Sequence, residues 1–216
     1  MISRYYNNLS LLDRMIQRIY DHLQKKGLLE RTILVIMGDH GQAFGQHHPD
    51  NYLHYRYSYE ENLETPVILY QPALFRPRVI EFPTSHVDLL PTLLDAMRIP
   101  YHPSLLDGES LFQRKLKRRY IFFYGHEESI SALDTDRIKV QVSLKKNRCW
   151  AFDLKADPEE KNPLDCSSYS PQLEALRRFV AHHDSSLVQY HARLKEGKDF
   201  QGHRHPTLTQ SAKSIE

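Results

Sequence analysis

One short apolar run, residues 32–37, is followed at once by two groups that can bind a metal ion. The run is rich in branched side chains and ends at Gly38, which predicts a strand buried on both faces, as in a parallel sheet. Asp39 and His40 come directly after it. Because reactive groups in open α/β sheets lie at the carboxyl ends of strands, we expect this strand to deliver both side chains to a site.

An Asp–His pair after a strand has two interpretations. In the structural one, Asp39 caps a turn and His40 is an ordinary neighbour. In the functional one, both bind a divalent metal, because carboxylate and imidazole are common metal ligands. The chain has 13 histidines, which gather after this strand and near the C-terminus, and this favours the functional interpretation.

The overall composition is that of a globular protein. With 216 residues, 40% hydrophobic and 26% charged, the chain can bury a core as one domain. A net charge of +2 gives no argument for nucleic acid as a partner. No secretory signal or membrane-spanning run is present, so we expect the chain as given to be soluble, or to be part of a longer protein. Cys149 and Cys166 either pair in an oxidising compartment or are unrelated thiols.

Hydrophobic periodicity predicts the other elements. Helices are expected at residues 1–30, 85–97 and 171–194, and a second buried strand at 66–70. Three apolar or alternating segments with short polar connections predict a small antiparallel sheet, at residues 119–124, 137–144 and 149–154.

Five motifs follow the Asp–His pair in order. They are Gln46-His47-His48, Tyr52-Leu53-His54, Tyr59-Glu60-Glu61-Asn62, Thr65-Pro66-Val67-Ile68-Leu69-Tyr70 and Ser85-His86-Val87-Asp88-Leu89-Leu90-Pro91-Thr92-Leu93-Leu94. This order resembles the C-terminal part of the sulfatase-like branch of the alkaline phosphatase superfamily. The branch includes sulfatases, lipid phosphoethanolamine transferases and lipoteichoic acid synthases. The resemblance covers roughly residues 5–165, and no single motif carries it.

The resemblance implies an α/β fold, namely the C-terminal half of an alkaline-phosphatase-like α/β sandwich with a small antiparallel sheet and a C-terminal helix. It divides the chain into a partial catalytic domain at 1–165, a helical extension at 166–196 and a flexible tail at 197–216. Asp157 and Glu159 match a turn in the family, so we do not expect them to be a catalytic carboxylate pair.

The resemblance also implies roles for single residues. Asp39 and His40 would bind a divalent metal, and His54 would contact the metal or the substrate anion. Sulfatases often have a lysine near His54; this chain has none there, and Arg56 is the candidate for the missing positive charge. Zinc or manganese is favoured and calcium is possible, because imidazole suits softer ions. This donor pair slightly favours phosphoryl transfer over sulfate hydrolysis.

Three other histidines are weaker candidates. His47 and His48 lie in the same loop as His54 but match the family's histidine less well. His86 belongs to an element that is a structural signature behind the site in the family, so we expect its role to be mainly structural.

Half of the family's site has no counterpart in this chain. The nucleophile and the acidic metal ligands come from an earlier strand and helix, and nothing before Asp39 offers them. We therefore expect a fragment that is inactive alone, whose partners are a sulfate- or phosphate-ester substrate and a missing N-terminal half. The alternative is a catalytically inactive binding or structural module. The family suggests a periplasmic or other extracytoplasmic location, with a membrane anchor only through a missing N-terminal segment.

Overall fold

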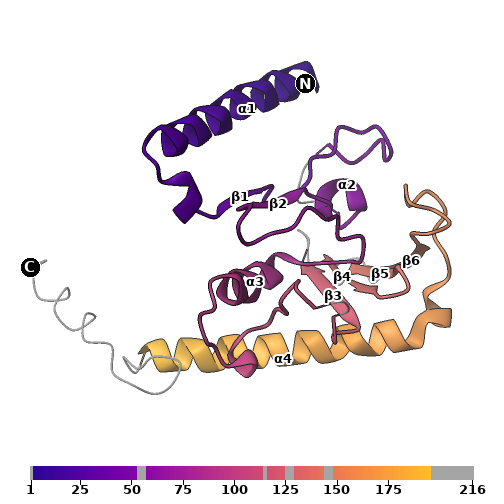
Figure 1. The fold of residues 1–216 in the computed structure, drawn as a ribbon. Coiled ribbons are helices and arrows are strands. Elements are labelled where there is room, and N and C mark those ends of the chain that lie inside the picture. Colours follow the sequence, from indigo (N-terminus) through magenta and orange to yellow (C-terminus); the bar gives the residue numbers. More distant parts are fainter. Residues whose placement is uncertain (1, 53–56, 114–115, 125–128, 144–147, 196–216) are drawn as a thin grey trace, which may run out of the picture.

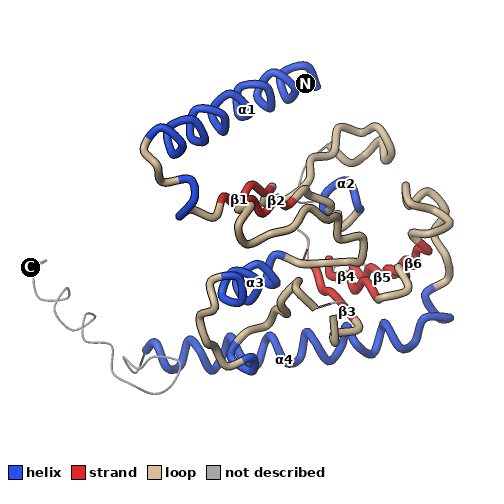
Figure 2. The backbone as a smooth tube through the Cα atoms, viewed as in Figure 1, coloured by secondary structure: helices blue, strands red, loops and turns tan. Residues whose placement is uncertain are grey.

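Two separate antiparallel sheets organise the chain (Figures 1 and 2). The computed structural model describes residues 2–52, 57–113, 116–124, 129–143 and 148–195, so the expected tail at 197–216 lies outside it. Helix α1 lies beyond the two-stranded sheet, and the long helix α4 runs beneath the four-stranded one (Figure 1). The expected α/β class, with a small antiparallel sheet and a C-terminal helix, is confirmed.

The first sheet pairs β1 (Leu34–Met37) with β2 (Val67–Tyr70), and its strands are antiparallel. The expectation of a parallel sheet buried on both faces is therefore wrong. A parallel partner needs a long crossover, usually through a helix. Here the one helix among the described residues of the connection is the short α2 (Glu60–Leu63), and the connection folds back on itself where the Gly41 N–H donates to the Asn62 carbonyl at 2.8 Å. The connection therefore returns the second strand in the opposite direction.

Helix α1 (Ile2–Lys25) stops before Gly27, whose positive φ of 66° suits a residue without a side chain. None of its residues is buried, and Leu12 and Ile19 are 50% and 55% exposed. Its aromatic contact with the sheet is that of Tyr20 with Tyr70, with ring centroids 5.9 Å apart. The helix was expected to pack on the sheet, but most of its apolar stripe is open to solvent.

The second sheet has the order β3–β4–β5–β6 and is antiparallel throughout. Its strands are Tyr120–Tyr124, Ser129–Asp134, Ile138–Ser143 and Arg148–Asp153. The sequence predicted three of them and missed β4, whose serines interrupt the apolar pattern. Helix α4 (Ser170–Lys195) covers one face of this sheet, with Leu176 packed against Ile130 and Val140.

The opposite face of the second sheet buries a charged cluster. Lys139 on β5 is fully buried, and its ammonium donates to the Ser58 carbonyl at 2.7 Å and to Glu60 Oε1 at 3.0 Å. It also lies 2.5 Å from Glu160 Oε1. Glu160 Oε2 accepts from the Glu60 backbone N–H at 2.6 Å, so this cluster ties α2 to the sheet.

The expected helix at 85–97 is present as a short 3-10 turn, η2 (His86–Asp88), followed by α3 (Leu89–Ala96). The Asp88 carboxylate is fully buried, forms a bidentate pair with Arg118 and accepts from the Ser85 N–H at 2.8 Å. A side chain at Gly108 would overlap the Val87 carbonyl, so only glycine fits there. The remaining 3-10 turns are η1 (Leu29–Arg31), η3 (Pro103–Leu105) and η4 (Cys166–Tyr169).

The segment around Asp157 is a turn, as expected. Its carboxylate accepts from the backbone N–H groups of Lys161 and Asn162 at 3.1 and 2.7 Å, while Glu159 pairs with the Lys161 ammonium. Within the described residues, no helix combines the length and apolar content needed to cross a bilayer.

Cys149 and Cys166 form a disulfide, with Cα atoms 6.0 Å apart, that fastens η4 to β6. We expect replacement of both by serine to lower the free energy of unfolding by about 3 kcal/mol, because the bond closes a loop of 17 residues and restricts the unfolded chain. Urea unfolding of the double variant and the wild type measures this difference. Equal midpoints under oxidising and reducing conditions for the wild type would contradict it.

Candidate functional site

Asp39 and His40 lie in a tight turn directly after β1. The Gly38 N–H donates to the Pro66 carbonyl at 3.2 Å, and the Gly41 N–H donates to the Asn62 carbonyl. One end of the turn is therefore fastened to α2, and the other to the residue just before β2. The Asp39 side chain is 87% exposed and that of His40 is 41% exposed, so both can be reached from solvent.

The two side chains direct ligand atoms into the same space. Nδ1 of His40 lies 2.9 Å from the Gly41 carbonyl, which can only accept, so Nδ1 donates there and Nε2 is the ring nitrogen that a metal ion could bind. Oδ1 of Asp39 accepts from the His40 backbone N–H at 3.0 Å. Nε2 and the second carboxylate oxygen, Oδ2, then face each other at 3.4 Å, an arrangement that suits a divalent cation.

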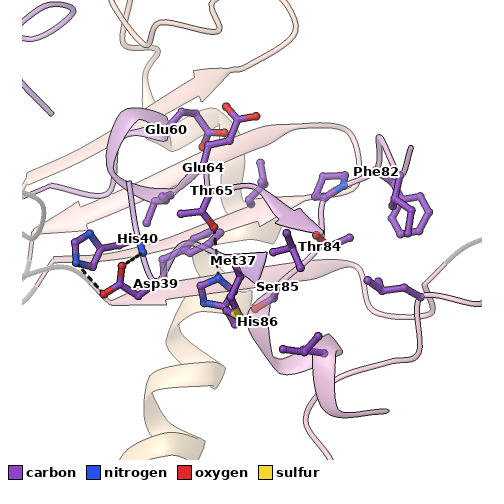
Figure 3. Close-up of a pocket in the computed structure, with 18 of the residues that line it drawn as sticks. Met37, Asp39, His40, Glu60, Glu64, Thr65, Phe82, Thr84, Ser85 and His86 are labelled. Atoms are coloured by element: carbon purple, nitrogen blue, oxygen red, sulfur yellow. Dashed lines mark hydrogen bonds and ion pairs between the residues drawn. The ribbon is translucent and has the colours of Figure 1, made fainter. Parts of the chain in front are cut away.

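This pair borders a cavity of about 360 Å³ between the two sheets, shown in Figure 3. Thr65 and His86 lie together in the cavity, with Oγ1 and Nε2 3.5 Å apart, and Glu60 and Glu64 lie on another side. Beyond these and the Asp–His pair, the lining residues include Met37, Asn62, Leu63, Val67, Ile80, Glu81, Phe82, Pro83, Thr84, Ser85, Leu89, Leu111, Phe123, Leu133 and Arg137.

The charges around the cavity favour a cation. Four lining residues carry carboxylates: Asp39, Glu60, Glu64 and Glu81. Arg137 is the single arginine or lysine among the described lining residues, and it lies 3.9 Å from Glu60. An anionic ester would be repelled by this lining unless a cation were bound first.

The other predicted site residues are distributed as follows. His54 and Arg56 lie outside the described residues. His47 and His48 border a different hollow, where His47 Nδ1 is 3.4 Å from Glu159 and His48 Nδ1 is 2.9 Å from Glu61. His86, expected to be mainly structural, is exposed in the cavity.

Several cavity residues escaped sequence reasoning. Phe123 lies on β3 and Arg137 in the connection between β4 and β5, and their distance from the Asp–His pair in sequence gave no signal. Glu60 and Thr65 lie inside the motifs that resemble the family, but the sequence analysis assigned no role to either residue. Glu60 could have been noticed, because an acidic residue starting a helix next to tyrosines is a good candidate for a charged contact.

The metal fit is partial. A carboxylate and an imidazole oriented by a backbone carbonyl are suitable ligands. However, the described residues contain no group of three or more histidine, cysteine or acidic side chains able to hold an ion. This turn offers two potential ligands, and a complete coordination shell would require others.

Comparisons with known proteins agree with this fold. The sulfatase family model matches residues 1–99. An arylsulfatase of Clostridium perfringens is 25% identical over 187 residues, covering 82% of this chain and 38% of that protein. An N-acetylglucosamine-6-O-sulfatase of Bacteroides thetaiotaomicron is 28% identical, covering 93% and 38% respectively. The solved structure of BT4656 in complex with its substrate D-glucosamine-2-N,6-O-disulfate superimposes with a TM-score of 0.62 and 22% identity, covering 82% of this chain and 39% of that one.

The fold is therefore that of the sulfatase-like α/β proteins. The chain belongs to the sulfatase family of the alkaline phosphatase superfamily. It spans less than two-fifths of the length of these two curated relatives.

Proposed function

We propose that this chain supplies part of the divalent-metal site of a sulfate-ester hydrolase, with Asp39 and His40 as ligands. The observation that carries the proposal is the convergence of His40 Nε2 and Asp39 Oδ2, 3.4 Å apart, at a cavity lined by carboxylates. Zinc or manganese fits this pair better than calcium does, because one ligand is an imidazole.

A bound divalent ion would polarise the ester oxygen and stabilise the charge that develops in the transition state. The chain's own residues hold and orient the site. The Gly41 carbonyl holds the His40 ring through Nδ1 so that Nε2 is the nitrogen available to a metal ion, and Arg137 lines the same cavity with a positive charge. His54 and Arg56 remain proposed contacts to the metal or the substrate anion, on the sequence resemblance alone.

We propose sulfate esters as the substrates, because the relatives are named as sulfatases. The Asp–His pair by itself slightly favours phosphoryl chemistry. Both curated relatives are named as sulfatases, and the solved complex contains a sulfated glucosamine. Sulfate monoesters of aryl alcohols or amino sugars are therefore the proposed class, with phosphate esters and transfer reactions as the variants to test.

We also propose that the active form includes residues beyond this chain, which would supply the nucleophile and the remaining ligands. Three observations support this: the two-ligand turn, the open apolar stripe of α1 and the share of the relatives that the chain spans. The disulfide supports an oxidising, extracytoplasmic location, because such bonds persist there.

One observation favours a second function, a catalytically inactive binding or structural module. The described residues hold no group of three potential metal ligands. In that case the fold would be kept for a partner, and neither metal binding nor turnover would depend on Asp39.

Calorimetric titration of the chain with zinc or manganese tests the metal assignment. We expect one site whose affinity falls at least tenfold in the double variant Asp39→Ala, His40→Ala, because both ligands leave. The matched control is Asp21→Ala, His22→Ala, which removes the same dipeptide from the exposed surface of α1 and should leave binding unchanged. Equal affinity in the wild type and in the Asp39→Ala, His40→Ala variant would show that the metal does not bind at this turn.

A further inference from the structure

A buried asparagine lies behind the candidate metal turn. Asn51 is fully buried, in the loop that also carries His47 and His48, and the sequence assigned no role to this asparagine. Its amide nitrogen donates to Glu61 Oε1 at 2.6 Å and to Asn62 Oδ1 at 2.5 Å. Because both partners are acceptors, the orientation of this amide is determined, and Asn51 is tied to two consecutive residues of α2.

The same two residues of α2 form the surface on which the candidate metal turn rests. The Asn62 carbonyl accepts from the Gly41 N–H at 2.8 Å. A side chain at Gly41 would overlap the Glu61 carbonyl, so the turn lies directly against α2. The position of His40 therefore depends on where α2 holds these two backbone carbonyls.

The loop that carries Asn51 is itself fixed at several points. The backbone carbonyl of Asn51 accepts from the Gly45 N–H at 2.9 Å, and the backbone N–H of Asn51 donates to the His48 carbonyl at 2.8 Å. The His48 ring stacks on Tyr59, with centroids 3.7 Å apart, and its two nitrogens face Glu61 Oε1 and the Glu160 carbonyl. Burial raises the pKa of Tyr59 to about 12, consistent with a closely packed loop. Asn51 therefore connects the hydrogen-bonded segment at residues 45–51 to α2.

We infer that Asn51 is a positioning residue for the metal turn. Through its two hydrogen bonds it holds α2 where the Asn62 carbonyl binds Gly41, and so sets the direction of the Asp39 and His40 side chains. This inference rests on the proposed function for its catalytic meaning, while the hydrogen-bond chain itself is independent of it. Outer-shell groups of this kind change metal affinity by roughly 10- to 100-fold.

The test uses the whole chain and two measurements. In Asn51→Ala, we expect hydrogen exchange of the Gly41 amide to be at least about tenfold faster and zinc affinity to fall about tenfold. Asn51→Ser keeps one hydroxyl donor, so exchange and zinc affinity should lie between those of the wild type and Asn51→Ala. This variant replaces Asn51→Ala in the test if the alanine variant does not fold. The matched control is Leu176→Ala, a buried position on the sheet-facing side of α4, which should lower Tm but leave both measurements unchanged.

Faster Gly41 exchange in the Asn51 variants, but not in Leu176→Ala, supports the inference. Wild-type exchange and affinity in Asn51→Ala overturn it. If the wild-type chain binds no zinc, the proposed metal site fails, and exchange at Gly41 alone decides whether Asn51 holds the turn.

Discussion

Replacing Lys139 by methionine is expected to lower the free energy of unfolding by about 3–5 kcal/mol, because it takes the nearest positive charge from the buried Glu160 carboxylate and from the partly buried Glu60 carboxylate. Lys139 is fully buried and lies within 3.0 Å of both Glu60 and Glu160. Methionine has a similar length, so the loss should come from the charge rather than from a cavity. Urea unfolding at neutral pH measures the difference.

The loss in this variant should depend on pH in a defined direction. Burial raises the pKa of Glu160, and the neighbouring Lys139 opposes that rise. Folded Glu160 thus binds its proton more tightly than in the unfolded chain, so its contribution to stability falls as the pH rises from the unfolded pKa through the folded one. Without Lys139 the folded pKa rises further. The stability deficit should therefore be smaller at pH 5 than at pH 8.

Two further variants isolate the buried charge. Adding Glu160→Gln to Lys139→Met should recover part of the loss, because one uncompensated carboxylate is gone. Lys161→Met breaks the exposed pair with Glu159 and should leave Tm unchanged. A loss in Lys139→Met that is equal at both pH values and is not relieved by Glu160→Gln would show that packing, and not charge, is responsible.

The second large effect concerns catalysis by the completed domain. When the residues that complete the sulfatase domain in the relatives are supplied on the same chain or as a second chain, we expect turnover of an aryl sulfate. Asp39→Ala should then lower kcat/KM at least roughly 100-fold, because a metal that stabilises the transition state loses a ligand. A chromogenic aryl sulfate assay, with an aryl phosphate in parallel, measures both the rate and the preferred ester.

The control for this experiment is Asp21→Ala, on the exposed surface of α1, which should keep wild-type turnover. Addition of the completing residues should also raise Tm and reduce binding of a hydrophobic dye, since the apolar stripe of α1 is open in the chain alone. Turnover by the chain alone would contradict the proposal that the nucleophile lies elsewhere. Full activity in the Asp39→Ala variant would show that Asp39 is not a metal ligand.

Local patterns predicted several elements correctly because the signals that determine them are local. The helical repeat and Gly27 identified α1, and the apolar pattern with Pro91 identified α3. The direction of β2 was predicted wrongly, because a buried apolar run looks the same in a parallel and an antiparallel sheet. Strand β4 was missed because its serines face a buried polar surface, where a strand does not need an apolar alternation.

The sequence by itself determined that an aspartate and a histidine follow a strand, with glycines on both sides that allow a tight turn. Only the tertiary structure decided which atoms of that pair converge, because this depends on the His40 ring donating to the Gly41 carbonyl and on the contact of the turn with α2. It also decided the pairing of Lys139 with Glu60, 79 residues apart in sequence, and the support of α2 by Asn51. Such contacts join segments whose sequences carry no mutual signal, so they arise only when the packed chain buries polar groups that must find partners.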